Sequence, residues 1–337
     1  MREYSKQLSA PKWVRYGLIP LPASIGGKLG TMLTGNDPAS DAVPSRFAGF
    51  RRHLTLIRPH QWFKNLFVLA PAFFGGKGAL LFSSVRPALA FASFCAAASA
   101  VYIFNDIFVL ERDRIHERKR FRPLAAGTVA MHIAIAMMCG LVVTAAAAAF
   151  WVNPNFAYYV AGYLVLNTFY TLYFKHVSIV DISFIAAGFV IRVLAGGVAT
   201  DVVVSKWLIL MTFLLACCLA VGKRRDDLLL NVDAEALRPA HRGYTLRFVD
   251  TCLVILGSVT IVCYVMYTVS DEVVRRLHTD QVYLTSGFVI VGILRFLQIA
   301  IVEQKSGAPT MILLKDTMIQ AMVGLWFISF LLILYTA

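Results

Sequence analysis

Charged residues are scarce in this sequence. They make up 15% of the 337 residues, while hydrophobic residues make up 58%. The apolar residues gather in runs long enough to cross a bilayer, which excludes an ordinary soluble domain. The runs also lack the short alternating segments of a membrane β-barrel, and backbone exposed to lipid must pair its polar groups internally. The sequence therefore predicts an all-α polytopic membrane protein.

Cysteine is also rare, and its placement excludes two kinds of site. All six cysteines fall within apolar segments, and none has a partner at metal-ligand spacing. We interpret them as small packing residues, not as a zinc site or a disulfide framework. Acidic residues are fewer than basic ones, 19 against 32, but most cations stand in loops beside apolar runs, where they orient a membrane protein. Nucleic acid is therefore not an expected partner.

The N-terminal residues 1–50 lack the apolar core and processing site of a cleavable signal peptide, and prolines interrupt them. We expect a poorly ordered or surface-lying extension over 1–50 and a transmembrane domain over 51–337. The apolar runs of that domain predict nine spans, at about residues 66–82, 88–109, 132–152, 156–174, 179–199, 207–221, 248–269, 283–302 and 317–335.

The stretch from Tyr102 to Gly127 mixes acids and bases more densely than any other part of the chain. Its residues Asn105, Asp106 and Asp113 offer hard oxygen ligands of the kind that Mg²⁺ takes. Asp106 and Asp113 are seven residues apart, so on a continuous helix they differ by about 20° in azimuth and share a face. The cations that follow within a few turns are potential phosphate partners; they are Arg118, Lys119, Arg120 and Arg122.

A second charged cluster, residues 222–227, follows the sixth predicted span. Four crossings separate it from the first cluster, so both emerge on the same side of the membrane and can face each other. Their Lys and Arg content predicts the cytoplasmic side, together with the N-terminus. Short turns such as Asn153-Pro154-Asn155 predict antiparallel neighbouring helices.

Polar residues also stand inside or beside other spans. Arg192 lies within the fifth span, and an ionisable residue there usually faces the bundle interior, which makes it a candidate site residue. Asp181 lies near the boundary of the same span and is interpreted as a helix cap. Before the first span, Trp62 suits an interfacial anchor and Lys64 can extend along the membrane surface.

Four stretches of the sequence resemble the UbiA superfamily of intramembrane prenyltransferases, and within it the decaprenyl-phosphate phosphoribosyltransferase branch. They are RPHQWFKNLFVLAP at 58–71, NDIFVLERDRIHERKRFRPLAAG at 105–127, IRVLAGGVAT at 191–200 and GKRRDDL at 222–228. The resemblance implies a nine-helix bundle in a bacterial inner membrane. It also implies transfer of 5-phosphoribose from phosphoribosyl diphosphate to a polyprenyl phosphate, which yields a precursor of arabinofuranosyl donors.

The resemblance further implies roles for particular residues. Mg²⁺ is expected on Asn105, Asp106, Asp113 and Asp227, and the three aspartates are the expected catalytic residues. Tyr170 matches a tyrosine that contacts the ribose. For Lys223, the alternative to phosphate binding is an ion pair with Asp227. For about half of the basic residues, the alternative is that they orient the protein in the bilayer or contact anionic lipid. The expected phosphate-binding residues are Lys64, Lys119, Arg122, Lys175, Arg192, Lys223 and Arg224.

Val109 departs from the family pattern, which has an acid at this place. On a continuous helix the position lies about 60° from Asp106, so a carboxylate is missing on the ligand face. Three explanations remain open: looser metal binding with activity retained, a site rebuilt with Glu111 where the helix ends, or lost catalysis.

Two other functions remain open at this point. A ring-directed prenyltransferase would use the same fold with an isoprenyl diphosphate donor. A transporter or lipid-binding protein would also place polar residues inside spans. If the phosphoribosyl reaction is correct, the pentose has two candidate destinations, a cell-wall arabinan or a nodulation factor.

Overall fold

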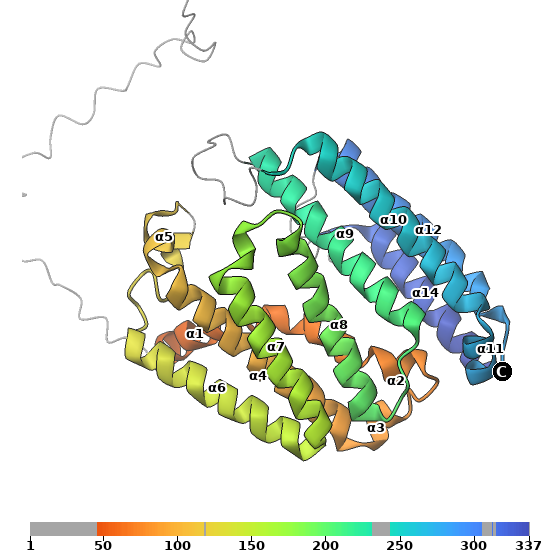
Figure 1. Cartoon of the computed structure of the whole chain (residues 1–337), viewed down its shortest axis with the longest axis horizontal. Coiled ribbons are helices and arrows are strands. Elements are labelled where there is room, and N and C mark those ends of the chain that lie inside the picture. The colour runs from red at the N-terminus through yellow and green to blue at the C-terminus, as the bar shows by residue number, and fades with distance from the viewer. Residues whose placement is uncertain (1–45, 118, 231–242, 305–311, 313–314, 337) are drawn as a thin grey trace, which may run out of the picture. The chain divides into compact units, whose positions relative to one another are not determined.

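The computed structural model describes residues 46–117, 119–230, 243–304, 312 and 315–336. Most of the predicted extension over 1–50, and Arg118, lie outside these ranges. Helix α1 (Arg46–Ile57) begins within the last residues assigned to that extension. The described residues form helices and turns without a strand, which confirms the all-α prediction (Figure 1).

Seven helical segments among the described residues are long and apolar enough to cross a membrane. An eighth long helix, α7 (Pro154–Leu172), lies where the fourth span was predicted but is not among the seven. The predicted count of nine is not confirmed. The seven segments are α4 (Val85–Phe108), α6 (Met131–Val152), α8 (Val180–Thr200), most of α9 (Lys206–Leu230), α10 (Leu246–Val269), the run Gln281–Val302 and most of α14 (Thr317–Thr336).

The run Gln281–Val302 changes helix type twice. It begins as the 3-10 helix η7 (Gln281–Thr285), continues as α12 (Ser286–Leu297) and ends in a π-helical turn, η8 (Gln298–Val302). A short helix, α11 (Asp271–Leu277), connects it to α10.

The first predicted span, residues 66–82, is wrong as a continuous helix. The chain instead forms the 3-10 helix η2 (Pro59–Val68), the short helix α2 (Ala70–Phe74) and the short helix α3 (Leu80–Ser83). Glycines separate α2 from α3, and Gly76 has a φ of 70°, a backbone conformation that residues with a side chain rarely adopt. An apolar composition does not distinguish such a broken segment from a spanning helix.

Side-chain caps fix where several helices begin. Ser84 accepts a hydrogen bond from the backbone N–H of Arg86 at the start of α4, and Thr245 accepts one from Phe248 at the start of α10. Asn153 accepts one from the N–H of Asn155, and Pro154 follows it in the first turn of α7. These bonds satisfy N–H groups that a helix start leaves open. The predicted turn at residues 153–155 is shorter than expected, because Asn153 alone separates α6 from α7, and Pro154 and Asn155 already belong to α7.

Small side chains hold the helices of one half of the bundle close together. Helix α4 packs on α6, and its Ser93 donates a hydrogen bond to the backbone oxygen of Ala145. Buried alanines line this contact, including Ala97 and Ala149. In the other half, α9 packs between α8 and α10, and α12 packs on α14 (Figure 1). Close helix approach through small residues is typical of membrane bundles.

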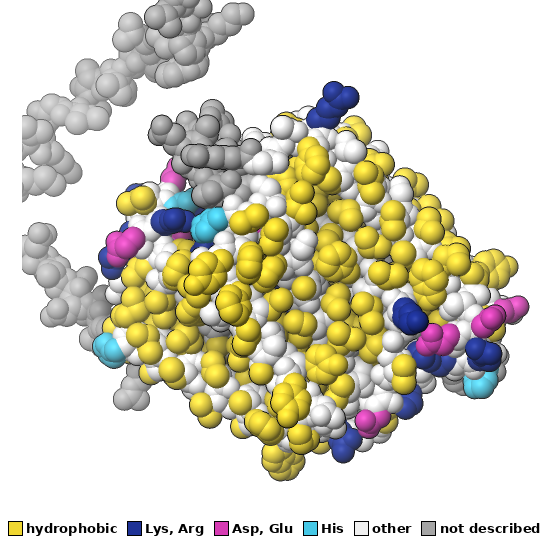
Figure 2. All heavy atoms as spheres, viewed as in Figure 1, with side chains coloured by type: hydrophobic (Ala, Val, Ile, Leu, Met, Phe, Trp, Pro, Cys, Tyr) yellow, Lys and Arg dark blue, Asp and Glu magenta, His cyan; other side chains and the backbone are white. Residues whose placement is uncertain are grey.

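The surface of the bundle is largely apolar. Figure 2 shows hydrophobic side chains over the middle of the face, with charged side chains at its opposite edges. Exposed residues of this kind include Val143, Phe150 and Ile255. A membrane location follows from this belt together with the seven long apolar helices.

Helix η2 lies directly against α8. A side-chain carbon on Gly196 would overlap the backbone oxygen of Val68, so the two backbones touch at this glycine. Asn65 on η2 and Arg192 on α8 are hydrogen-bonded near the same contact. The short segment that replaced the first predicted span is therefore held inside the bundle.

Gly196→Ala should lower the free energy of unfolding by about 1–3 kcal/mol, because the added carbon has no room beside Val68. Thermal unfolding of purified protein in detergent measures the change. Gly162→Ala on α7 is the control, since a side-chain carbon there meets nothing within 4 Å. Equal midpoints for the two variants would contradict the close contact.

Candidate active site

The first acidic cluster lies where α4 ends. Helix α4 stops at Phe108, Val109 has a φ of −102° and a ψ of 12°, and α5 (Leu110–Ile115) begins at the next residue. Despite this break, Asp106 and Asp113 converge on one guanidinium: Nη1 of Arg122 lies 3.1 Å from Oδ1 of Asp106 and 2.6 Å from Oδ2 of Asp113. The structure thus brings the two carboxylates together, as their spacing predicted.

Arg58 completes this cluster and was absent from the residues predicted for the site. Its Nη2 lies 2.6 and 2.7 Å from the two oxygens of Asp106. Arg58 precedes the first residue of η2 and has a φ of 53°, a left-handed conformation that is uncommon outside glycine. The only sequence signal for its role was its place at the start of the 58–71 stretch.

Glu111 does not rebuild the site. The helix does end beside it, but its side chain is 81% exposed and pairs with Arg114 at 2.9 Å. This result overturns one of the three explanations for Val109. The first cluster therefore contributes two carboxylates and the amide of Asn105, which is half-buried on α4.

The second cluster joins α8 and α9 through Arg224. Its Nε donates to Asp181 at 2.8 Å, and its Nη1 donates to Asp227 at 3.2 Å. Asp181 also accepts a 2.8 Å hydrogen bond from the hydroxyl of Tyr244. Asp181 makes no side-chain cap, so the prediction that it caps α8 is wrong.

Lys64 connects the two clusters electrostatically. Burial, the largest cause, and the charges of Lys223, Arg192 and Arg58 together lower its pKa from 10.5 to about 8. Arg58 belongs to the first cluster and Lys223 to the second. Both clusters lie toward the same edge of the bundle in Figure 1, at the ends of α4 and α9. Lys64 is therefore a cation placed among cations, which is an environment that favours a bound anion.

Arg192 holds η2 in place. Its Nε donates to Asn65, its Nη1 to the oxygen of Gly188 and its Nη2 to Tyr163, each at 2.8 to 2.9 Å. The guanidinium also lies 4.5 Å from the ring centre of Tyr163 and 5.3 Å from that of Phe189. These partners are neutral, so the described hydrogen bonds of Arg192 include no carboxylate, and its side chain is buried in the bundle interior, as its place within a span suggested.

Trp62 bonds a neighbouring helix, and its interpretation as an interfacial anchor stays a prediction. Its Nε1 donates to Ser99 on α4 at 3.0 Å, and Ser99 donates to the oxygen of Ile57 at 2.8 Å. The tryptophan thus fastens η2 to α4.

The remaining residues predicted for the site differ in how far their side chains are buried. Lys175 is buried on η4 (Phe174–His176), with its Nζ 4.6 Å from the ring centre of Phe108. Tyr170 is half-buried and interacts electrostatically with Arg224. Lys119 is half-exposed on η3 (Lys119–Phe121), and Lys223 is exposed. Their roles toward a ligand stay predictions.

The carboxylates of the first cluster fit a magnesium ion that arrives with a phosphate ligand. Asp106 and Asp113 point at one position, now held by Nη1 of Arg122. Across the described ranges no three His, Cys, Asp or Glu side chains form a metal-binding group. Mg²⁺ does not require one, because it keeps several waters and commonly binds through one or two carboxylates plus substrate phosphates.

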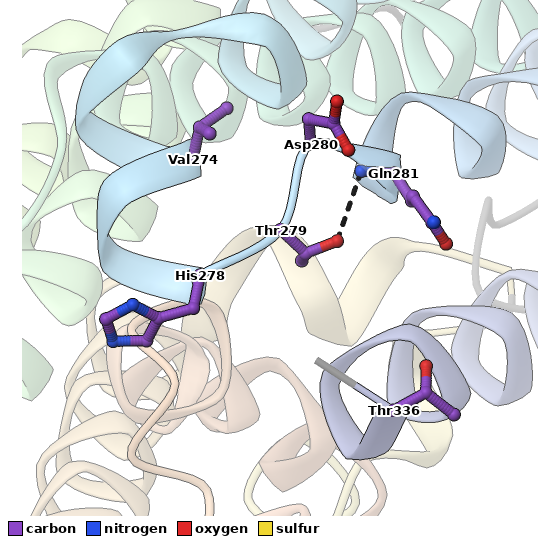
Figure 3. A pocket seen from close by; sticks show the side chains of 6 residues that line it. All are labelled: Val274, His278, Thr279, Asp280, Gln281 and Thr336. Atoms are coloured by element: carbon purple, nitrogen blue, oxygen red, sulfur yellow. Dashed lines mark hydrogen bonds between the residues drawn. The ribbon is translucent and has the colours of Figure 1, made fainter.

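A separate hollow of about 720 Å³ lies at the end of α11, near the C-terminal end of α14. Figure 3 shows His278, Thr279, Asp280 and Gln281 around it, with Thr279 accepting a hydrogen bond from the N–H of Gln281. Its charged groups are exposed and do not converge as the two clusters do. The clusters at the ends of α4 and α9 are therefore the stronger candidate for an active site.

Lys64→Met should raise the thermal midpoint below pH 8 and reduce the stabilisation that added inorganic diphosphate provides. The pKa of Lys64 is lowered in the folded state, so the unfolded chain binds more protons between pH 8 and 10.5. Charged Lys64 therefore destabilises the fold below pH 8, and this cost falls as the pH rises toward 10.5.

Thermal unfolding across that pH range, with and without diphosphate, tests this expectation. Lys206→Met is the control, because Lys206 is exposed at the start of α9. A Lys64→Met variant less stable than the unmodified chain at pH 7 would refute the electrostatic account.

Known proteins resemble the chain over most of its length. The sequence model of the UbiA prenyltransferase family matches residues 66–310. The decaprenyl-phosphate phosphoribosyltransferase of Mycolicibacterium smegmatis is 31% identical over 281 residues, which cover 80% of this chain and 88% of that protein. Nodulation protein NoeC of Azorhizobium caulinodans is 27% identical over 179 residues, 53% of this chain and 58% of that protein.

The fold also matches solved structures. A UbiA homolog from Archaeoglobus fulgidus bound to GPP and Mg²⁺ has a TM-score of 0.63 to this chain and 18% sequence identity. The match covers 84% of this chain and 99% of that homolog. A likeness at this identity shows a shared fold.

Proposed function

The chain belongs to the UbiA prenyltransferase family, and on that premise we propose that it transfers 5-phosphoribose from phosphoribosyl diphosphate to a polyprenyl phosphate. The observation that carries this proposal is that two carboxylate–arginine clusters lie toward one end of the bundle. Charges from both clusters lower the pKa of Lys64. The name of the mycobacterial relative supports the choice of donor and acceptor.

The proposed donor site lies at the first cluster, with Asp227 reaching it from the second. Asp106, Asp113 and Asp227 would hold Mg²⁺ together with the diphosphate, and Asn105 would add an amide oxygen. When bound, this ion neutralises part of the diphosphate charge and so improves it as a leaving group. The bond between C1 of the ribose and the diphosphate oxygen breaks, and C1 bonds to an oxygen of the lipid phosphate.

Arg58 and Arg122 are placed to stabilise the charge that grows on the diphosphate. Together with Asp106 and Asp113 they form a nearly neutral group, so each can turn from a carboxylate oxygen to a phosphate oxygen without a large change in total charge. The acceptor phosphate is anionic at neutral pH, so the reaction needs no general base. This accords with a site built from Asp, Arg and Lys.

Lys64 and Arg192 add positive charge to the site besides that of Arg58 and Arg122. Lys64 lies among cations, and the described hydrogen bonds of Arg192 all go to neutral groups. We propose that Lys64 and Arg192 bind the phosphates that enter the site. The further candidates for substrate binding are Lys119, Lys175 and Lys223 for phosphate and Tyr170 for ribose. Arg224 is engaged by two aspartates, so its proposed phosphate contact is secondary to holding Asp227.

The proposed setting is a bacterial inner membrane with both clusters on the cytoplasmic side. Phosphoribosyl diphosphate would then enter from the cytoplasm and the lipid from the bilayer. The product would be a precursor of arabinofuranosyl donors, used in a cell-wall arabinan or in decorating a nodulation factor. The similarity to NoeC supports the nodulation factor as a candidate destination of the pentose. Pentose analysis of exported glycans after gene deletion distinguishes the two, and an unchanged arabinose content contradicts both.

Asp106→Asn should lower phosphoribosyl transfer by about 10²-fold or more, since it removes a charge from the centre of the first cluster. The assay uses purified protein in nanodiscs with labelled phosphoribosyl diphosphate, Mg²⁺ and a polyprenyl phosphate. Glu111→Gln is the matched control, because this nearby acid is exposed and pairs with Arg114. Product formed from an isoprenyl diphosphate and an aromatic ring, but not from phosphoribosyl diphosphate, would replace this proposal with ring prenylation.

Val109→Asp should reduce the Mg²⁺ concentration needed for half-maximal activity, on the order of tenfold, by adding a third carboxylate beside Asp106. The substitution is structurally tolerable, because residue 109 precedes the first turn of α5 and aspartate is favoured at such a position. Activity is measured across a Mg²⁺ titration. Activity in Val109→Asp alone would mean that the unmodified chain has lost catalysis, and an unchanged Mg²⁺ requirement would mean that position 109 does not reach the ion.

A further inference from the structure

A groove of about 370 Å³ lies at the C-terminal end of α8, between α7, α8 and the loop that leads to α9. Its lining includes Tyr159, Leu194, Val198 and Val203. Asp201, which also lines it, follows the last residue of α8, whereas Asp181 of the second cluster stands in the first turn of that helix. At 1.5 Å per residue, the two aspartates are about 30 Å apart along the helix axis. The groove is therefore separate from the proposed donor site.

The loop that forms one wall of the groove is apolar and lies tightly against α8. It reads Val202-Val203-Val204, and Val203 is 77% exposed. A side-chain carbon on Gly197 would lie 2.5 Å from Cγ2 of Val204 and 2.8 Å from the backbone oxygen of Val202. The loop thus lies closer to α8 than a residue with a side chain at 197 would allow. A fixed apolar wall of this kind suits an acyl chain, because burying it removes apolar surface from water.

Exposed aromatic side chains place this end of the bundle at a membrane boundary. Phe82 on α3, Trp151 near the end of α6 and Tyr158 near the start of α7 are 93%, 80% and 75% exposed. In Figure 1 these parts of the chain lie at the same end of the bundle as the end of α8. Exposed Trp and Tyr gather where the hydrocarbon of a bilayer meets its headgroups. The groove therefore lies at the depth where a lipid changes from acyl chain to headgroup.

Two cations stand at the edge of the groove, next to Asp201. Nζ of Lys77 donates to the backbone oxygen of Asp201 at 3.0 Å, and Nη1 of Arg86 lies 3.4 Å from its Oδ2. The side chains of Arg86 and Asp201 are 54% and 72% exposed, so this long ion pair contributes little. The three residues together carry one positive charge in excess. A phosphate group can therefore replace Asp201 as the partner of Arg86 at small cost.

We propose that this groove binds one anionic phospholipid, from the leaflet at the opposite end of the bundle from the two clusters. The lipid phosphate contacts Lys77 and Arg86, and one acyl chain lies in the groove against Leu194 and Val203. The excess positive charge selects an anionic headgroup, and the apolar wall selects a lipid over a soluble anion. The proposal does not depend on the proposed function, because neither cation belongs to the donor site.

Thermal unfolding of the delipidated full-length protein in detergent tests the headgroup preference. Dioleoylphosphatidylglycerol and dioleoylphosphatidylcholine are titrated separately; they share the same acyl chains, and only the first has a net negative charge. The unmodified chain should need about fivefold less of the anionic lipid for half-maximal stabilisation. The double variant Lys77→Gln, Arg86→Gln should lose this preference. A preference that survives in the double variant would overturn the proposal.

Asp201→Asn should have the opposite effect, because it removes the carboxylate that competes with the lipid for Arg86. Asp201 has a φ of 50°, a left-handed conformation that asparagine adopts readily, and the backbone oxygen that Lys77 contacts is kept. Affinity for the anionic lipid should rise about fivefold, with that for the zwitterionic lipid unchanged. A lower thermal midpoint without a gain in affinity would show that Asp201 and Arg86 form only a structural pair.

Arg276→Gln is the matched control for the loss of a cation. Arg276 on α11 also pairs with a carboxylate, that of Glu272 at 2.6 Å. It stands at the same end of the bundle, since its backbone oxygen would lie 3.9 Å from a side-chain carbon on Gly76, but it does not line the groove. The variant should keep the lipid preference within about twofold. A loss as large as that of the double variant would mean that lipid is attracted to charge in general, without a defined site.

Crosslinking locates the bound lipid. A phosphatidylglycerol with a photoreactive diazirine in its acyl chain should label peptides that contain Tyr159 or residues 194–204, and unlabelled phosphatidylglycerol should compete. Equal labelling of these peptides by a phosphatidylcholine probe would contradict an anionic headgroup. Competition by a polyprenyl phosphate at lower concentration than phosphatidylglycerol would identify a polyprenyl lipid as the occupant instead. Labelling confined to other peptides would overturn the site itself.

Discussion

A charge inside a bundle of apolar helices must be paired or hydrogen-bonded where it stands, and the site of this protein depends on that constraint. Asp106, Asp113 and Asp181 are buried, and each meets a guanidinium from another element. Asp106 meets two guanidinium groups, those of Arg58 and Arg122, while the described ion pairs of Asp113 and Asp181 are with Arg122 and Arg224. The ion pairs therefore fix the end of α4 relative to Arg58 and Arg122, and the start of α8 relative to α9.

Sequence periodicity predicted the all-α class and the proximity of Asp106 and Asp113, although the two aspartates lie on separate helices and not on one continuous face. It failed for residues 66–82, since the broken segment there is as apolar as a spanning helix. Arg58 and Tyr244 were missed for a different reason. Arg58 lies 48 residues from Asp106, and Tyr244 lies 63 residues from Asp181. Contacts between separate elements leave no periodic signal in either element.

Both clusters place carboxylates beside arginine. Arg58 and Arg122 bond Asp106 and Asp113 in the first cluster, and Arg224 bonds Asp181 and Asp227 in the second. Lys64 is affected by cations of both clusters and has a lowered pKa. The site therefore offers cations to an anion and carboxylates to a cation. A metal-bound diphosphate has both charges.

The contact between η2 and α8 has a consequence for biosynthesis. Asn65 and Arg192 are 127 residues apart in the chain, and the glycine that admits the Val68 backbone comes later still. At about 5–20 residues per second, Asn65 is added to the chain roughly 6–25 s before Arg192. During that interval the segment bearing Lys64 lacks its contact with α8, although α4, which it also contacts, has been made. We expect that a nascent chain ending before α8 cannot assemble the site, whatever helices it has already inserted.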